Sequence, residues 1–268
     1  MKNKEEEETE AQQIVPIAGR LKDHTNARVG LRRSGISIST EELLKFQLDF
    51  ARARDAVQRE IDENDVFQRL KSIDERAVLV YSAASSLQMY LQRPDLGRIL
   101  SVESEAQLKD RNPEKSDICI VLTGGLSSAA IHQAFPLIER LAAALQGEGT
   151  TVAPLVLAHR GRVAIGDPIG ALLKAQLSLV LVGERPGMSS SNSLGAYLTY
   201  APQPGKTDES RNCLSNIREG GLSVDEAVFT LLWLIRESLR LKMSGVQLKD
   251  RSRESLTLKD GAKPIADE

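Results

Sequence analysis

The sequence predicts an α/β protein built on a mostly parallel open sheet with helices on its faces. Two continuous apolar runs, at 117–123 and 177–183, are typical of strands that are buried on both sides. Segments with apolar residues at helical spacing alternate with such runs along the chain. Strands and helices in alternation favour a parallel sheet between helical layers.

A smaller helical region is expected before this domain, at residues 39–110. Ser39 and Glu42 have the spacing of a capping box, and apolar residues recur three and four positions apart after them. A second helix is expected at 64–72. Residues 1–38 are expected to form a flexible acidic segment, because they include a run of glutamates and too few apolar residues to offset the entropy of ordering.

The α/β domain itself is placed at 111–248, and the polar residues 249–268 are predicted to form a flexible tail. Further elements are expected inside the domain: a helix at 127–145, a strand at 151–158, a short helix with Asp167 as N-cap and Pro168 at its first position, a half-exposed strand at 194–201, and a last helix that begins with the capping box Ser223 and Glu226.

Composition narrows the class of protein. The net charge is -2, with 35 basic and 37 acidic residues, and aromatic residues make up only 4%. We therefore expect no nucleic-acid partner. The apolar runs are too short to cross a membrane, and residues 1–13 have no apolar core of a signal peptide, which predicts a soluble cytoplasmic protein. The two cysteines, Cys119 and Cys213, favour a reducing compartment without disulfides.

Catalytic and metal-binding motifs are missing. The first strand ends in the adjacent glycines Gly124 and Gly125, and no third glycine completes a dinucleotide fingerprint. The amides at 126–128 allow either an anion site at a helix N-terminus or an ordinary tight turn, and the turn is favoured. None of the three histidines lies in a recognised catalytic or zinc-binding pattern. We predict no catalytic residue and no metal ligand in this chain.

The loop after the strand at 177–183 is the strongest indication of a binding site. Glu184, Arg185, Pro186 and Gly187 are followed by the small polar residues 189–192. Open α/β sheets bind their ligands at the carboxyl ends of strands. Taken alone, however, the charged pair Glu184 and Arg185 favours a local ion pair.

Six blocks in unbroken order resemble one family. They read "YLQRPDLGRIL", "TGGLSSAAI", "HRGRVAIGDPIGALLKA", "LVLVGERPGMSSSNSLGAYLTYAP", "RNCLSNIREGGLSVDEA" and "KMSGVQL". Together they are similar to the small (light) subunit of ethanolamine ammonia-lyase, over about residues 25–248. The block "GERPG" alone would be a weak signal, whereas six blocks in order are a specific one.

This resemblance implies an adenosylcobalamin-dependent lyase that converts ethanolamine to acetaldehyde and ammonia. In that family a large subunit with a TIM barrel holds the substrate. The small subunit is non-catalytic and closes over the cofactor at the interface, within a higher-order hetero-oligomer. Matching motifs carry over three cofactor-binding residues, Val163, Glu184 and Cys213. His159 lacks the D-x-H-x-x-G context of cobalt-ligating histidines, so we expect no cobalt ligand from this chain.

A different class of function stays open beside the lyase. The acidic N-terminal segment favours an adaptor or scaffold role, in which it directs an enzyme complex into a bacterial microcompartment. The two interpretations are compatible, because the family serves ethanolamine utilisation. The expected location is therefore cytoplasmic, inside such a compartment.

Overall fold

The computed structural model describes residues 27–29, 31, 33–34, 36–188 and 190–254. Most of the expected N-terminal segment and most of the expected C-terminal tail lie outside the described residues. The described chain divides into two compact units. One comprises the residues up to Ala53 together with Gly187–Ser190, and the other comprises Arg54–Pro186 and the residues from Ser191 onward.

The first unit consists of a short hairpin and most of a long helix. Strands β1 (Arg33–Ser34) and β2 (Ser37–Ile38) pair antiparallel and lead into α2 (Thr40–Gln58). The helix starts where the capping pattern predicts, since the Glu42 N–H donates to Ser39 Oγ at 3.4 Å. No residue of α2 is buried.

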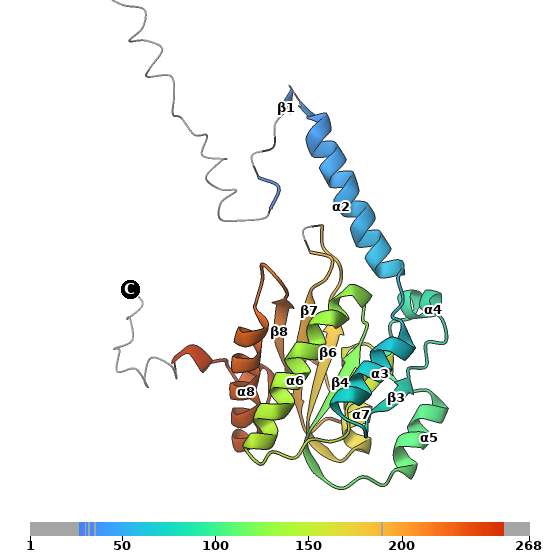
Figure 1. Ribbon diagram of the computed structural model, residues 1–268, viewed down its shortest axis with the longest axis vertical. Coiled ribbons are helices and arrows are strands. Elements are labelled where there is room, and N and C mark those ends of the chain that lie inside the picture. Colours follow the sequence, from blue (N-terminus) through green and yellow to red (C-terminus); the bar gives the residue numbers. More distant parts are fainter. Residues whose placement is uncertain (1–26, 30, 32, 35, 189, 255–268) are drawn as a thin grey trace, which may run out of the picture. The chain divides into compact units, whose positions relative to one another are not determined.

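The second unit is built on a six-stranded sheet with the order β3-β5-β4-β6-β7-β8 (Figure 1). The strands β3, β5, β4 and β6 are parallel to one another, and β7 and β8 each run antiparallel to the preceding strand in the sheet. Their bounds are β3 Val78–Tyr81, β4 Ser116–Thr123, β5 Val156–His159, β6 Ala175–Gly183, β7 Leu194–Tyr200 and β8 Arg211–Ile217. The predicted α/β class with a mostly parallel open sheet is confirmed.

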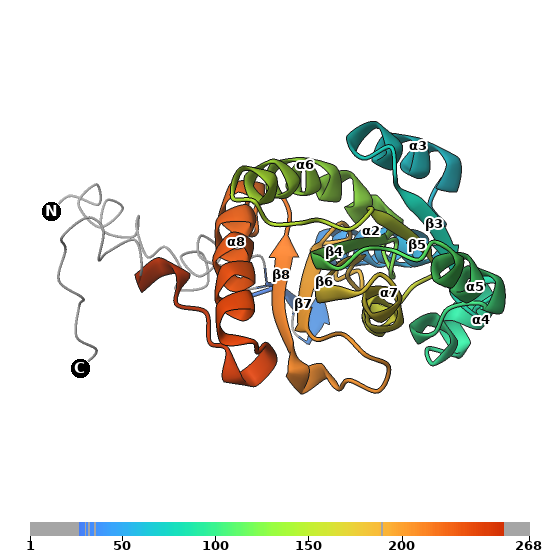
Figure 2. The ribbon, with the colours of Figure 1, turned by 90° about the horizontal axis from the view of Figure 1, so that it is seen from below.

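Helices cover both faces of the sheet (Figure 2). On one face lie α3 (Glu63–Ile73), α6 (Ile131–Gly147) and α8 (Val224–Leu241), and on the other lie α5 (Val102–Asp110) and α7 (Gly166–Leu172). The short helix α4 (Leu87–Gln92) follows β3. Five 3-10 turns complete the second unit, at Leu96–Arg98, Ser128–Ala130, Val163–Ile165, Asp208–Ser210 and Gly245–Gln247.

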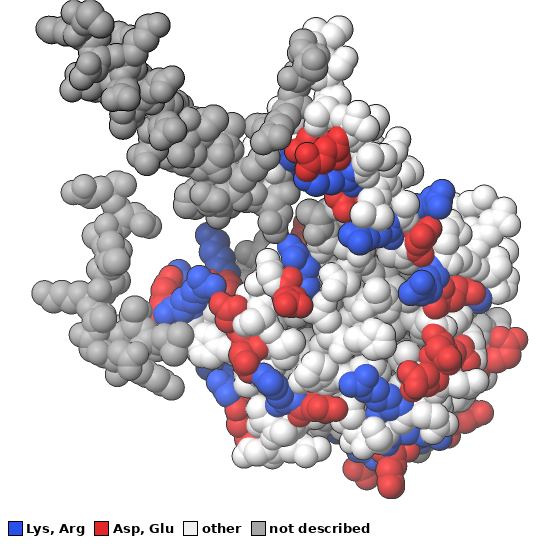
Figure 3. All heavy atoms as spheres, turned by 45° about the horizontal axis from the view of Figure 1, so that its top comes forward, with Lys and Arg blue, Asp and Glu red and all other residues white. Residues whose placement is uncertain are grey.

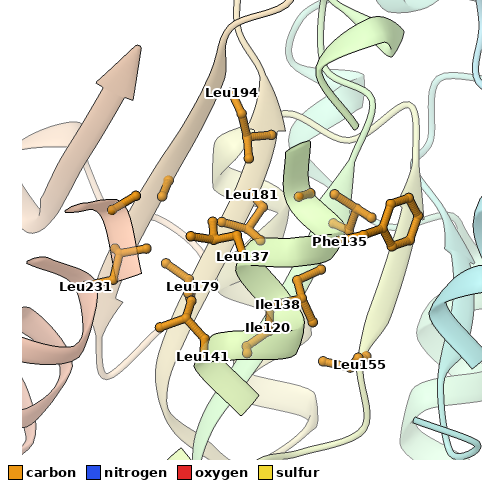
Figure 4. Close-up of a cluster of buried hydrophobic side chains, with 14 of the residues drawn as sticks. Ile120, Phe135, Leu137, Ile138, Leu141, Leu155, Leu179, Leu181, Leu194 and Leu231 are labelled. Atoms are coloured by element: carbon orange, nitrogen blue, oxygen red, sulfur yellow. The ribbon is translucent and has the colours of Figure 1, made fainter. Parts of the chain in front are cut away.

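The alternation of side chains along each strand divides the core in two. Leu177, Leu179 and Leu181 of β6 belong to the cluster under α6 and α8, where they pack near Leu137 and Leu141 (Figure 4). The intervening residues Val180 and Val182 belong to the second cluster, under α5 and α7. This second face carries the candidate site.

Two strands of the six-stranded sheet were absent from the sequence-based prediction, as was the short hairpin of β1 and β2 within the segment expected to be flexible. β3 lies within the range 39–110 that was expected to be helical, and it pairs in parallel with β5. β8 was assigned no secondary structure, and the strand expected at 151–158 begins only at Val156. We attribute these differences to pairing between distant segments, because four apolar residues in a row give no local indication of a strand or a helix.

Asp167 is not the N-cap that the Asp-Pro pair suggested. A 3-10 turn at Val163–Ile165 leads directly into α7, which begins at Gly166, so that Asp167 lies inside the helix. Its carboxylate is 2% exposed and is held by Arg211. The strand expected to be half-exposed, β7, is instead largely buried, because both faces of the sheet are covered there.

Candidate functional site

The three residues taken from the family resemblance come from different elements. Val163 opens the 3-10 turn after β5, Glu184 follows β6 directly, and Cys213 lies within the edge strand β8. Side chains two apart in a strand share a face, so Glu184 points to the same side as Val182. Tyr197 of β7 lies next to both Glu184 and Cys213 and so connects these two residues.

Tyr197 is paired with Val180 on one side and with Cys213 on the other. The two side chains interact, because Cys213 is one of the groups that raise the pKa of Tyr197. A side chain on Gly195 would collide with both Tyr197 and Glu184, which shows how closely these two residues approach. Glu184, Tyr197 and Cys213 therefore form one cluster on the α7 face of the sheet.

Val163 joins this cluster through a groove of about 910 Å³ that both Val163 and Tyr197 line. The groove is lined by basic and acidic side chains in equal number, and Ile99 and Leu100 contribute apolar surface. The charged residues are Arg98, Arg162, Lys206, Glu105, Asp167 and Asp208. The Val163 carbonyl oxygen accepts one hydrogen bond, from the Gly166 N–H. A carbonyl oxygen has two lone pairs, so a second donor has room there.

Two donors from the chain fix the Glu184 carboxylate. Its Oε2 accepts a hydrogen bond from Ser193 Oγ at 2.5 Å and another from the Asn216 N–H at 3.1 Å. Within the part of the chain that the structure describes, Oε1 accepts no hydrogen bond and no ion pair joins Glu184 to Arg185. The local ion pair that sequence alone favoured is therefore not formed, and one carboxylate oxygen has no hydrogen-bond partner among the described residues.

The turn after β4 holds the end of β6 in place. The Leu126 N–H donates to the Gly183 carbonyl oxygen at 2.9 Å, and Ser127 Oγ donates to the Ser191 carbonyl oxygen at 2.6 Å. The Ser127 N–H donates to the Gly124 carbonyl oxygen at 3.2 Å. Two of the three amides considered for an anion site thus donate to backbone carbonyl oxygens, one in the turn and one at the end of β6, which supports the tight-turn interpretation.

The environment of Cys213 keeps its thiol protonated. Partial burial raises the pKa of Cys213, and the Glu184 carboxylate raises it further, against the opposing hydrogen bond from Tyr197. The pKa of Tyr197 is raised as well, mainly by burial and then by its contact with Cys213. A neutral, exposed thiol presents a small polarizable surface to a ligand and does not act as a nucleophile at neutral pH.

A buried ion pair connects the two sides of the site. Arg211 donates to both carboxylate oxygens of Asp167, at 2.7 and 2.6 Å, and both side chains are 2% exposed. Arg211 also donates to Thr199 Oγ1 and to the Lys206 carbonyl oxygen, each at 3.0 Å. Asp167 follows Val163 by four residues and Arg211 precedes Cys213 by two, so the pair fixes one candidate residue relative to the other.

His159, at the end of β5, belongs to a separate cluster of charges. Its Nδ1 lies 3.2 Å from Glu63 Oε2, and its Nε2 lies 3.9 Å from Glu60 Oε1. Burial lowers the pKa of His159, and the Arg160 guanidinium lowers it further, against the two carboxylates. In the described part of the chain, no three His, Cys, Asp or Glu side chains are close enough to bind a metal ion.

This lowered pKa predicts a pH-dependent stability. The unfolded chain takes up a proton on His159 at a pH near 6.5, before the folded chain does. We expect the free energy of unfolding to fall between about pH 7.5 and pH 5.5, and we expect part of that fall to be absent in His159→Gln. Chemical denaturation of both proteins at the two pH values measures this, and equal falls in the two proteins would contradict it.

The remaining surface gives no single-sign patch on the face shown in Figure 3, where basic and acidic residues are interspersed. No helix among the described residues has both the length and the apolar character that a membrane span requires.

The fold and the candidate site identify the class of protein. It is an open α/β protein with a polar cluster and a groove on one face of its sheet. Residues 17–249 match the family model described as ethanolamine ammonia-lyase light chain (EutC). The chain is 48% identical over 251 residues to the ethanolamine ammonia-lyase small subunit of Xanthomonas campestris pv. campestris (strain B100), with 92% of each chain covered. It is 50% identical over 233 residues to the small subunit of Rhodopseudomonas palustris (strain BisA53), with 87% of this chain and 89% of the relative covered. The chain belongs to the ethanolamine ammonia-lyase small-subunit family, which confirms the resemblance seen in the sequence.

Proposed function

We propose that this chain binds adenosylcobalamin together with the large subunit of the lyase, through Val163, Glu184 and Cys213. A small subunit implies a larger partner, and the family name gives the reaction as the deamination of ethanolamine. The bound cofactor supplies the radical chemistry of that reaction. This chain supplies the surface that holds and orients the cofactor, as a non-catalytic subunit of a higher-order hetero-oligomer.

The residues present are chemically suited to cobalamin. The rim of the corrin ring carries primary carboxamides, whose N–H groups need acceptors. The single observation that carries the proposal is the geometry of Glu184, whose Oε2 is held by Ser193 and Asn216 while Oε1 receives no donor from the described residues. A fixed carboxylate with a free oxygen is a strong acceptor for an amide N–H.

The other two residues complement this acceptor. The Val163 carbonyl oxygen has a lone pair left for a second amide donor. Cys213 is exposed and neutral, and Tyr197 behind it is partly buried, so the two present a fixed apolar edge for the ring to lie against. Glu184 thus supplies a charged acceptor, the Val163 carbonyl oxygen a neutral acceptor, and Cys213 an apolar contact. The three residues come from different elements on one face of the sheet.

The substitution Glu184→Gln tests this proposal. Replacing the carboxylate with an amide removes the charge that strengthens the hydrogen bond, so we expect cobalamin affinity to weaken by about 1.5–3 kcal/mol, or roughly 10- to 150-fold. Fold and assembly are expected to be unchanged, because the side chain keeps its size. Absorbance titration of the assembled complex measures the affinity.

The matched control is Glu219→Gln, which removes an exposed acidic side chain from the loop after β8. We expect this control to bind cobalamin as the unchanged protein does. Equal affinity in Glu184→Gln would show that the carboxylate has no part in binding.

The microcompartment role concerns residues 1–26, which lie outside the described residues, so it stays a separate prediction. We expect that deletion of residues 1–24 abolishes encapsulation of the complex and leaves cobalamin affinity unchanged. Fractionation of purified compartments measures the first quantity and absorbance titration the second. Normal encapsulation of the truncated protein would rule out targeting by this segment.

A further inference from the structure

Exposed apolar side chains are concentrated in one short segment of the chain. The described residues include fourteen large apolar side chains that are exposed, and seven of them fall within residues 36–50. These seven are Ile36, Ile38, Leu43, Leu44, Phe46, Leu48 and Phe50. Scattered exposed apolar residues need no explanation, whereas a concentration of this kind marks an interaction site.

The apolar residues of α2 occupy two sides of the helix. Leu43, Phe46 and Phe50 recur at spacings of three and four and form one stripe. Leu44 and Leu48 form a second stripe, roughly 150° away around the helix axis at 100° per residue. An ordinary surface helix has one apolar stripe that faces its own core. A helix with two such stripes and no buried residue needs a partner that covers it on both sides.

The charges of this helix favour a protein as that partner. α2 carries Glu41, Glu42, Asp49 and Asp55 against Lys45, Arg52 and Arg54. Helices that lie on membranes are rich in lysine and arginine, and nucleic acid also requires a positive surface. A nearly balanced charge with aromatic and aliphatic residues is typical of the centre of a protein–protein interface.

The exposed area is also of the right size. The exposed fractions of the seven side chains amount to about four whole side chains, or on the order of 600–1,000 Å² of apolar surface. A stable interface buries about 800 Å² on each partner. Phe46 and Phe50 are stacked with ring centroids 6.4 Å apart, and Arg28 lies over Phe46 at 5.4 Å, so the aromatic anchors are already ordered.

We propose that residues 36–50, the docking segment, insert into an apolar groove of the large subunit, which covers both stripes of α2 (labelled in Figure 1). This inference rests on the proposed joint function of the two subunits. Residues 1–26 of the chain offer only five large apolar side chains, Met1, Ile14, Val15, Ile17 and Leu21, fewer than the seven that must be covered. A second copy of the chain that pairs along one stripe would leave the other stripe exposed.

The test measures association of the full chain with purified large subunit, without cobalamin, by isothermal titration calorimetry. One variant combines Phe46→Ala with Phe50→Ala, and another combines Leu44→Ala with Leu48→Ala. Lys45→Ala, on the side of the same helix that faces away from both stripes, is the control. We expect each double variant to weaken association by at least about tenfold, and the control to leave it unchanged. Melting temperatures of the isolated chains are expected to be equal, because these side chains are not buried.

Three results would overturn the inference. The first is unchanged association in either double variant, because both stripes must be covered. The second is a wild-type chain that is dimeric by light scattering and becomes monomeric in the variants, which would make a second copy the partner. The third is tighter association after deletion of residues 1–24, which would show that the chain covers its own helix.

The outcome does not depend on the cofactor site. Glu184→Gln is expected to associate normally in the same assay, since Glu184 lies outside the docking segment. If Glu184→Gln also binds cobalamin normally while the stripe variants fail to associate, the cofactor site is wrong and the docking segment stands. The reverse pattern would refute the docking segment alone.

Discussion

Replacement of Arg211 by methionine is expected to lower the free energy of unfolding by about 3–5 kcal/mol. The substitution leaves the Asp167 carboxylate, 2% exposed, without its bidentate partner. An uncompensated buried charge costs far more than an exposed one, because no water replaces the lost donors. Chemical denaturation of the purified chain measures the change.

Two controls separate the loss of the pair from the loss of a positive charge. Arg240→Met breaks an exposed ion pair with Glu237, and we expect its effect to stay within about 1 kcal/mol. Arg211→Met combined with Asp167→Leu removes both charges, so most of the lost stability should return. A loss of less than about 1 kcal/mol in Arg211→Met alone would show that the buried pair contributes little.

The same pair also bears on the proposed cofactor site. Asp167 lies in α7, which continues from the turn that carries Val163, and Arg211 lies in the strand that carries Cys213. When the pair is lost, no hydrogen bond or ion pair among the described residues joins α7 to β8. We therefore expect the twice-substituted protein, although stable, to bind cobalamin more weakly than the unchanged protein.

Substitution of Gly183 by alanine is the second change with a large expected effect. A Cβ at this position would lie 2.1 Å from the Ser127 carbonyl oxygen and 2.3 Å from the Gly124 carbonyl oxygen. Both atoms belong to the backbone of the turn after β4 and cannot rotate away. We expect a loss of at least about 3 kcal/mol, the upper part of the range for overpacking. Glu184 follows directly, so cobalamin binding should be lost as well.

Gly187 provides the matched control within the same loop. A Cβ there would lie 3.6 Å from the Ser190 carbonyl oxygen, which is an ordinary contact. Gly187→Ala is expected to change stability by no more than about 1 kcal/mol. Thermal and chemical denaturation of the two variants compare them directly. Similar stability in both would mean that the close approach at Gly183 is relieved at little cost.

Local patterns were sufficient for the elements with strong periodicity. The apolar runs of β4 and β6 predicted strands, and the capping box of Ser223 and Glu226 predicted the start of α8 correctly. These features depend on neighbours in sequence. β3 and β8 depend on pairing with distant strands, and the pattern of β8 is misleading, because it begins with the buried Arg211.

The candidate site, like the fold, could be predicted only where local sequence was informative. The three candidate residues, Val163, Glu184 and Cys213, came from the family motifs. The position of Glu184 at the end of a strand indicated a binding loop, but the sequence alone favoured a local ion pair there. Tyr197 and Arg211 were missed, because their roles come from strand register and from a contact across 44 residues. The alternation of apolar and polar residues in β7 predicts the face on which Tyr197 lies. It does not predict which residue of the neighbouring strand is paired with Tyr197.

The most direct test of the account is a cryo-electron microscopy structure of the assembled complex with adenosylcobalamin. We expect Glu184 Oε1 within hydrogen-bonding distance of a corrin carboxamide, and Val163 and Cys213 in contact with the same ring. A cofactor that is held with all three residues remote from the corrin would contradict the account.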